Sequence, residues 1–208
     1  MRLATCFTHT AHAIQSDVPL NDDQIASVAP SIFSEVKHAG RSDRYWHIPT
    51  IAVPNALRAE GFQPFMVCQT AVRRADRRAY TKHMVRLRHA RHIPGPEAEE
   101  IILVNSHDGT SCYQMLAGMF RFVCKSGLVC GTVESDVRLP HRKAVADDVV
   151  ACAYDTVERF HRLRDIKEQM AGMLLDGAAQ RHSRMQRSPF ATVICRRGLL
   201  APLLPPTT

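Results

Sequence analysis

The chain has 208 residues, of which 45% are hydrophobic and 23% are charged, an ordinary globular composition that excludes wholesale disorder. This length allows one domain with a substantial core, or at most two small ones. The formal net charge is +7, and residues 71–92 carry all of that excess, because they hold eight basic residues and one acid. Charge concentrated in about a tenth of a chain indicates a surface for a negatively charged partner.

Several classes of protein find no support in the sequence. No apolar run approaches the ~18 residues that a membrane span requires, and residues 1–17 lack the apolar region of a secretory signal, so a cytoplasmic protein is expected. The seven cysteines have neither the spacing of a zinc site nor that of a disulfide framework, and no metal or other cofactor is expected. Motifs of phosphate-binding loops, serine hydrolases and zinc proteases do not occur, so no catalytic residue is assigned.

The first third of the chain predicts short helices. One begins near Asn21 or Asp22, whose side chains can accept hydrogen bonds from the free N–H groups of a first helical turn. Another ends at Gly61, a residue suited to a left-handed helix cap. That second helix begins either after a Thr50 cap or with Pro54 at its first position, where a missing N–H costs little.

A strand-rich region follows. Residues 62–72 are apolar and β-prone, and residues 83–89 alternate between apolar and basic side chains. Arg86 and Arg88 therefore share one face, while Val85 points the other way. The polar segment between the two strands makes them a hairpin with a basic tip and a basic outer face.

A central strand and a turn come next. Residues 101–104 are apolar on both faces, as in the middle of a sheet. His107 and Asp108 could act as a general base and its partner, or as two metal ligands. Adjacent residues of a strand point to opposite faces, however, and Asp-Gly is a strong turn signal. A turn is therefore favoured, with Asn105 and Ser106 bonding the local backbone.

The period becomes helical over residues 141–176. Apolar residues recur there at spacings of mostly three and four, which predicts one long amphipathic helix packed across the sheet, or against a partner helix in an oligomer. Residues 183–208 contain four prolines and no sustained period, which is typical of an irregular tail. The predicted fold is α+β: an antiparallel β-sheet with short N-terminal helices and the long C-terminal helix packed on it, in a single domain of residues 1–182.

Five segments carry a family likeness, in this order: PLNDDQIASVAPSIFS, RSDRYWHIPT, LRAEGFQPF, YTKHMVRLR and IILVNSHDGTSCYQMLAGMFRFVCKSGLVCG. Together they resemble the phage- and plasmid-related family called domain of unknown function 932, found in prophages and integrative elements of bacteria. The resemblance implies no catalytic residues. Family members usually continue further, so a truncated or frameshifted member is expected after about His182; reading the encoding DNA in the other frames tests this.

Charge and resemblance together predict a mobile-element protein that binds nucleic acid without catalysis, with single-stranded DNA favoured, in recombination or replication. A weaker similarity to single-strand annealing proteins, which place a curved antiparallel sheet against a long helix, supports this by analogy and adds a homo-oligomer as a partner. The predicted contacts are side chains that can track a phosphate backbone or stack on a base: Arg73, Arg74, Arg77, Arg78, Tyr80, Lys82, Arg86 and Arg88.

Alternatives stay open. Positive charge on an exposed edge strand can simply discourage pairing with another sheet. The same basic surface could meet an acidic face of a host defence protein. A nuclease or hydrolase centred on His107 and Asp108 is less favoured. Tyr45 and Trp46, beside Arg41 and Arg44, are further candidates for stacking on bases, although such aromatics more often pack in a core or at its rim.

Overall fold

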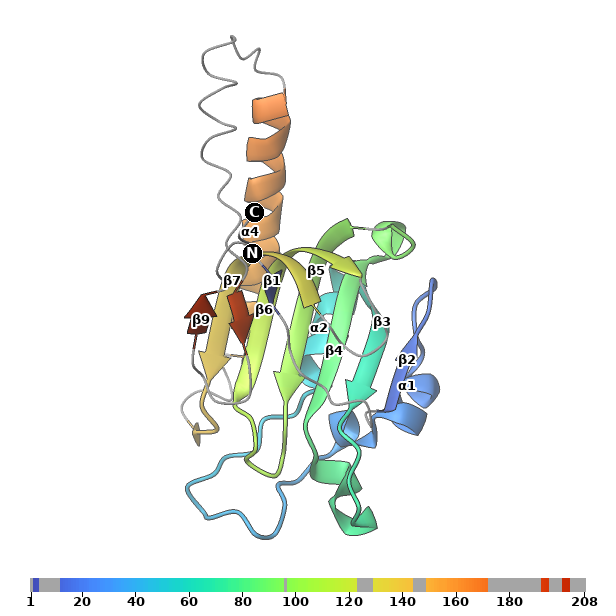
Figure 1. Cartoon of the computed structure of the whole chain (residues 1–208), viewed down its shortest axis with the longest axis vertical. Helices are drawn as coiled ribbons and strands as arrows, with labels where there is room; N and C mark the ends of the chain where they lie inside the picture. Colours follow the sequence, from blue (N-terminus) through green and yellow to red (C-terminus); the bar gives the residue numbers. More distant parts are fainter. Residues whose placement is uncertain are drawn as a thin grey trace, which may run out of the picture.

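The structure, a computed structural model of the whole chain, describes residues 2–3, 12–95, 97–122, 129–143, 149–171, 192–194 and 200–202. It confirms the predicted α+β class, with an antiparallel sheet and helices that lie along one of its faces (Figure 1). In this part of the chain no helix has both the length and the apolar character needed to cross a membrane.

Among the described residues, seven strands form the main sheet in the spatial order β1-β7-β6-β5-β4-β3-β2, and two more pair separately. The strands are β1 Arg2–Leu3, β2 His12–Gln15, β3 Phe62–Gln69, β4 His83–His89, β5 Glu97–Asn105, β6 Tyr113–Phe122, β7 Val129–Leu139, β8 Thr192–Ile194 and β9 Leu200–Pro202. The helices are α1 Asp22–Val28, α2 Ala52–Ala59 and α4 Val149–Ala171, with short 3₁₀ helices η1 Pro30–Phe33, η2 Ala75–Tyr80 and η3 Ala90–His92.

The order of the strands settles the place of the β3–β4 hairpin. Consecutive strands from β3 to β7 pair antiparallel, and β5 lies at the centre of the sheet, as its apolar residues predicted. β4 is hydrogen-bonded to β3 on one side and to β5 on the other. The alternative in which its arginines protect an exposed edge strand is therefore wrong.

The helix ends follow the predictions in part. Asn21 caps α1, since its side-chain oxygen accepts from the Gln24 amide at 2.8 Å and the Gln24 side chain accepts from the Asn21 amide at 3.0 Å. Gly61 has a φ of 82° just after α2, which confirms the left-handed cap. Both predicted starts of α2 are wrong, because Pro54 is its third residue and the Thr50 hydroxyl instead bonds Nε2 of His83 at 2.8 Å.

Both faces of the sheet carry buried apolar side chains. On one face the helices pack through Leu57 of α2 and Phe160 of α4 against strand residues such as Val85. Successive strand residues alternate, so Ile102 and Phe65 belong to a second buried cluster on the other face. A side chain on either face of β4 is therefore in the interior.

The contacts of helix α4 with the sheet that the structure describes lie in its first half. Phe160 lies 6.1 Å from Phe62 between ring centroids, and the Thr156 hydroxyl lies 3.7 Å from the sulfur of Met115. The second half extends past the end of the sheet (Figure 1). The predicted packing is thus confirmed for residues 149–160. His141 and Arg142, at the predicted start of the helix, are not helical, while residues 144–148, the predicted end and most of the predicted tail lie outside the described residues, so the division into domain and tail stays a prediction.

Candidate nucleic-acid interface

The loop between β3 and β4 carries the largest group of basic side chains. Four arginines in it are exposed and Lys82 is half-buried, against one exposed carboxylate, Asp76, so the loop has a net charge of +4. We call this group the basic tip: Arg73, Arg74, Arg77, Arg78 and Lys82. Two of these arginines, Arg77 and Arg78, belong to η2. Figure 1 places η2 at the end of the sheet away from α4.

A buried glutamine fixes the backbone of the basic tip. Gln69 is 1% exposed, and its side-chain nitrogen donates to the Arg78 carbonyl at 2.7 Å. Its side-chain oxygen accepts from both the amide and the hydroxyl of Ser31, at 3.1 and 2.7 Å. The Thr70 amide donates to the Lys82 carbonyl at 2.9 Å and closes the loop. The loop therefore holds its charges on a fixed backbone instead of a free coil.

Most of the charge at the tip is not neutralised. Arg74 pairs with Asp76 at 2.7 Å, and this hydrogen bond holds the pKa of Asp76 below its ordinary value. Arg78 donates to the neutral carbonyl of Ser27 at 3.1 Å and keeps its charge. Arg73 and Arg77 form no side-chain hydrogen bond or ion pair with any described residue. The tip thus presents positive charge to solvent on three arginines.

Arg86 and Arg88 do not belong to this surface. Both were expected on a basic outer face, but they are 0% and 1% exposed, so that expectation is wrong. Glu100 of β5 lies between them: its two oxygens accept from Nε of Arg86 at 2.7 Å and from Nε of Arg88 at 2.8 Å. Arg88 also donates to the Ile93 carbonyl at 3.0 Å, and its guanidinium lies 4.6 Å from the centroid of the Phe65 ring.

This triad is buried within the sheet and cannot reach a phosphate. Burial raises the pKa of Glu100, and the two guanidiniums oppose that rise. Removing one member of such a group leaves a charge buried without its partner, which is costly. The sequence held one clue: Glu100 stands beside an apolar run, and in the sheet it pairs directly with Arg88.

The aromatic candidates differ in accessibility. Tyr80 is half-buried, with its ring edge-on to His38 at 5.3 Å. Trp46 is 42% exposed and has the Lys143 ammonium 5.4 Å from its ring centroid. A base can stack only on an open ring face. Trp46 is therefore better placed for stacking than Tyr80, whose role as a contact stays a prediction.

A cluster of histidines lies beneath the loops at this end of the sheet. The rings of His47 and His107 are 4.5 Å apart and those of His83 and His107 are 5.3 Å apart, between centroids. Burial lowers the pKa of His83 to about 4 and that of His107 to about 2, and it also lowers the pKa of His47. Both nitrogens of His83 already bond hydroxyls, Nδ1 with Ser31 at 2.7 Å and Nε2 with Thr50 at 2.8 Å. Among the described residues no group of histidine, cysteine and acidic side chains is arranged to hold a metal ion.

The segment after β5, at Asp108 and Gly109, forms the predicted turn. Asp108 accepts from the amide and hydroxyl of Thr110 at 3.0 and 2.6 Å, and Gly109 has a φ of 73°. The Ser106 amide donates to the Asn105 side chain at 2.8 Å. His107 is fully buried and its pKa is far below neutral, so it is a poor general base that substrate cannot approach.

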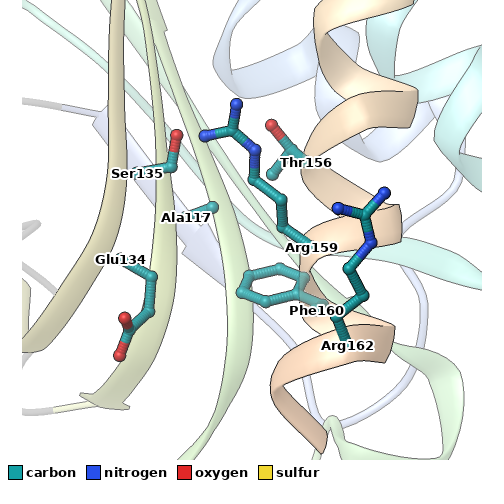
Figure 2. A pocket seen from close by; sticks show the side chains of 7 residues that line it. All are labelled: Ala117, Glu134, Ser135, Thr156, Arg159, Phe160 and Arg162. Carbon is teal, nitrogen blue, oxygen red and sulfur yellow. The ribbon is translucent and has the colours of Figure 1, made fainter.

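A hollow of about 280 Å³ lies between α4 and the sheet (Figure 2). Ala117 and Phe160 form its apolar floor, while Glu134, Arg159 and Arg162 stand at its edge. The apolar floor and the small volume do not suit a phosphate backbone. This hollow marks the place where α4 begins to leave the sheet.

A second basic surface lies at the same end of the molecule as the tip, and sequence reasoning named two of its arginines without placing them beside the third. Arg41, Arg44 and Arg142 line one pocket, although 97 or more residues separate the first two from the third. The runs RSDRYWH and PHRK were visible in the sequence. Only the antiparallel order of β5, β6 and β7 brings them together, because β7 ends beside the turn that follows β5.

Three comparisons relate the chain to known proteins. The model of the family described as "Domain of unknown function (DUF932)" matches residues 37–188. Two proteins of Escherichia coli (strain K12), "UPF0380 protein YafZ" and "UPF0380 protein YfjQ", are each 49% identical over 179 residues, covering 86% of this chain. The match spans 65% of the length of each of these relatives. No solved structure matches the chain.

Proposed function

The chain therefore belongs to the DUF932 family, whose description names no function, and we propose that this member binds nucleic acid without catalysis, through the basic tip. The observation that carries the proposal is the exposed, largely unpaired charge of Arg73, Arg77 and Arg78 on a fixed loop. Arginines in such an arrangement contact successive phosphates and release the counterions condensed on them. Contacts of this kind do not read sequence.

Single-stranded DNA is the favoured ligand. A loop that projects from the end of a sheet contacts a flexible strand more readily than a rigid duplex. The exposed ring of Trp46 at this end of the molecule offers a surface on which an unpaired base can stack. A sheet with a long helix on one face is also the general arrangement of single-strand annealing proteins, which supports the proposal by analogy only.

A role in recombination or replication of a mobile element accompanies this proposal. It derives from the resemblance of the five sequence segments to a phage- and plasmid-related family. Assembly into an oligomer would align several basic tips along one strand, and it would raise the apparent affinity without a new type of contact.

Binding of labelled oligothymidylate at a series of salt concentrations tests the proposal. The test variant replaces Arg73, Arg74, Arg77 and Arg78 with alanine. Each phosphate contact contributes about 0.7 to the slope of log K against log salt for a single strand, so the slope should fall by up to about 3. A control variant removes the same charge elsewhere: Arg91→Ala, Arg121→Ala, Arg159→Ala and Arg162→Ala, all at exposed positions.

The control variant should keep a slope close to that of the wild type. No binding by the wild type at low salt would end the nucleic-acid proposal and favour the host defence protein as the partner of the basic tip. Binding with an unchanged slope in the tip variant would leave the class of function intact and show that the site lies elsewhere.

A further inference from the structure

The second basic surface is a pocket with a volume of about 670 Å³. Three segments of the chain form it: residues 40–45, the turn at 109–112, and residues 140–142 after β7. The residues that matter here are Arg41, Arg44, Tyr45, Cys112, His141 and Arg142. Its volume lies within the range of about 300–1,000 Å³ that is usual for small-molecule sites.

The pocket is positively charged and its charge is unpaired. The side chains of Arg41, Arg44 and Arg142 are exposed and make no ion pair or hydrogen bond with any described residue. No carboxylate is among the described residues that line it. Asp43 and Asp108 adjoin the pocket in the chain; Asp43 lies 4.0 Å from Lys37, and Asp108 accepts from the neutral Thr110 hydroxyl, so the three arginines still outnumber the acids close to them.

The walls of the pocket are held in place by the fold. The Tyr45 hydroxyl donates to the Ser106 carbonyl at 2.7 Å, and the Tyr45 ring stacks on His141 with centroids 4.4 Å apart. The Trp46 amide donates to the His141 carbonyl at 3.0 Å. These bonds tie residues 40–45 to the end of β7 across the sheet, so the site exists before any ligand binds.

One glycine makes room for an arginine at the floor. Gly109 has a φ of 73°, which favours glycine, and a Cβ built there would lie 3.0 Å from Nη1 of Arg41. The Arg41 side chain therefore lies directly against the backbone of the turn. The turn after β5 thus serves the pocket, which gives the Asp-Gly sequence a role beyond reversing the chain.

The pocket adjoins the basic tip through a short chain of contacts. The His107 amide donates to the Tyr80 carbonyl at 2.8 Å, and the His38 amide donates to the His107 carbonyl at 3.0 Å. The Arg41 amide then donates to the His38 carbonyl at 3.0 Å. Tip and pocket are therefore parts of one end of the molecule that a single flexible strand can contact together.

We propose that this pocket binds a phosphate-bearing ligand, namely a nucleotide unit of the same strand that the basic tip contacts, an inference that rests on the proposed function. One guanidinium group can donate two parallel hydrogen bonds to two oxygens of a phosphate, so it recognises the shape of the phosphate as well as its charge. Three guanidiniums without an ion pair to any described residue line one pocket, and no carboxylate is among the described residues that line it, which provides that chemistry. A free nucleotide shares the same chemistry, and the experiment separates the two sources.

The test uses the intact chain, the variant Arg41→Ala/Arg44→Ala/Arg142→Ala and the charge-matched control Arg91→Ala/Arg121→Ala/Arg162→Ala. Oligothymidylate of about 20 nucleotides exceeds the ~4–16 nucleotides that one single-strand module occupies. The pocket variant should lower the slope of log K against log salt by about 2, since each lost phosphate contributes about 0.7. The control should keep the wild-type slope, and equal thermal unfolding temperatures should confirm that both fold.

An independent readout comes from Cys112, an exposed thiol in the pocket. Bound oligothymidylate should slow alkylation of Cys112 several-fold in the wild type and not in the pocket variant, as followed by mass spectrometry of the peptide. Cys152, a half-buried thiol near the start of α4, is the internal reference and should react at an unchanged rate.

The outcomes separate the two proposals. In one outcome the pocket variant shows the wild-type slope, with Cys112 unprotected in the wild type, while the tip variant loses binding. This result overturns the proposed role of the pocket and leaves the proposed function standing. Protection of Cys112 by a free nucleoside triphosphate, without any binding of oligothymidylate, overturns the strand as the ligand and the proposed function with it. Protection by neither probe overturns the phosphate site itself.

Discussion

The β3–β4 hairpin contains two groups of arginines, one buried in the sheet and one exposed to solvent. Arg86 and Arg88, within β4, are buried around the single carboxylate of Glu100. Arg73 and Arg77, a few residues earlier in the loop, are exposed without an ion pair to any described residue. A count of charge along the sequence treats these groups alike. The structure assigns one to stability and leaves the other available to a partner, because only one group has a carboxylate from a neighbouring strand.

The largest effect is expected from breaking the buried group. Glu100→Ala leaves two guanidiniums in the interior without their carboxylate, which should lower the free energy of unfolding by about 3–5 kcal/mol. Urea denaturation measures this. The matched control is Glu97→Ala, which removes an exposed acid that lies 3.2 Å from Arg121 and should cost less than about 1 kcal/mol. Equal losses in the two variants would contradict the structural role of the triad.

Acid should destabilise the protein at the same end of the sheet. The pKa values of His83 and His107 are lowered to about 4 and about 2 from 6.5, so the folded state keeps these rings neutral, whereas the unfolded chain takes up protons below pH 6.5. Their contribution is complete above pH 6.5 and is lost as pH falls from there towards 4. Below pH 6.5 each group loses about 1.4 kcal/mol per pH unit, so the pair loses about 3 kcal/mol between pH 7.5 and 5.5, nearly all of it in the lower unit. Asp108 opposes the shift of His83, and the lowered pKa values of His47 and His141 add to the loss.

Denaturation at pH 7.5 and 5.5 checks this. His107→Phe should reduce the pH-dependent loss by about 1.4 kcal/mol, because one neutral ring is then replaced by a group that cannot take up a proton. His92→Gln, at an exposed position, should leave the loss as in the wild type. Stability that does not change between the two pH values would show that these rings are not held neutral.

Loosening the tip without changing its charge gives a smaller effect. Gln69→Leu removes the side chain that joins the Arg78 carbonyl to the Ser31 amide. Leaving the buried Ser31 amide without its acceptor should cost about 1–3 kcal/mol, whereas the Arg78 carbonyl still accepts from the Thr81 hydroxyl at 3.3 Å. Affinity for single-stranded DNA should also fall, although every arginine remains. Gln63→Leu, at a half-buried position of the same strand, is the control. If the Gln69→Leu and Gln63→Leu variants bind single-stranded DNA with equal affinity, a fixed loop is not needed.

The smallest change concerns the one acid of the tip. Asp76→Asn frees Arg74 from its exposed ion pair, and the stability should change by less than about 1 kcal/mol. Affinity for single-stranded DNA should rise, because the net charge of the tip increases by one. Glu97→Gln makes the same change of charge at the opposite end of the sheet and should have less effect on binding. Weaker binding by Asp76→Asn would mean that the ion pair itself shapes the site.

The sequence predicted most of the fold and less of the site. Alternation over residues 83–89 located β4 to the residue, and the Asn21 and Gly61 caps follow from local hydrogen bonding and backbone geometry. Alternation separates two faces of a strand, but it does not say whether other residues cover each face. For that reason the burial of Arg86 and Arg88 was not predicted.

The pocket could not be predicted from the sequence for a different reason. Arg44 and Arg142 meet because β5, β6 and β7 follow one another in the sheet, and no local pattern contains that information. The helix α2 shows the same limit on a smaller scale. Thr50 looked like its cap, but the hydroxyl bonds His83, which lies 33 positions later in the chain.

The salt dependence of oligothymidylate binding tests the difference between the two groups of arginines most directly. It should be measured for the wild type, for the variant with Arg73, Arg74, Arg77 and Arg78 changed to alanine, and for an apolar interior variant, Arg86→Met/Arg88→Leu/Glu100→Leu. Replacement of a buried ionic triad by apolar residues of similar size often preserves the fold. We expect the tip variant to lose up to about 3 units of slope and the interior variant to keep the wild-type slope. A wild-type slope in the tip variant, or a reduced slope in a folded interior variant, would contradict the account.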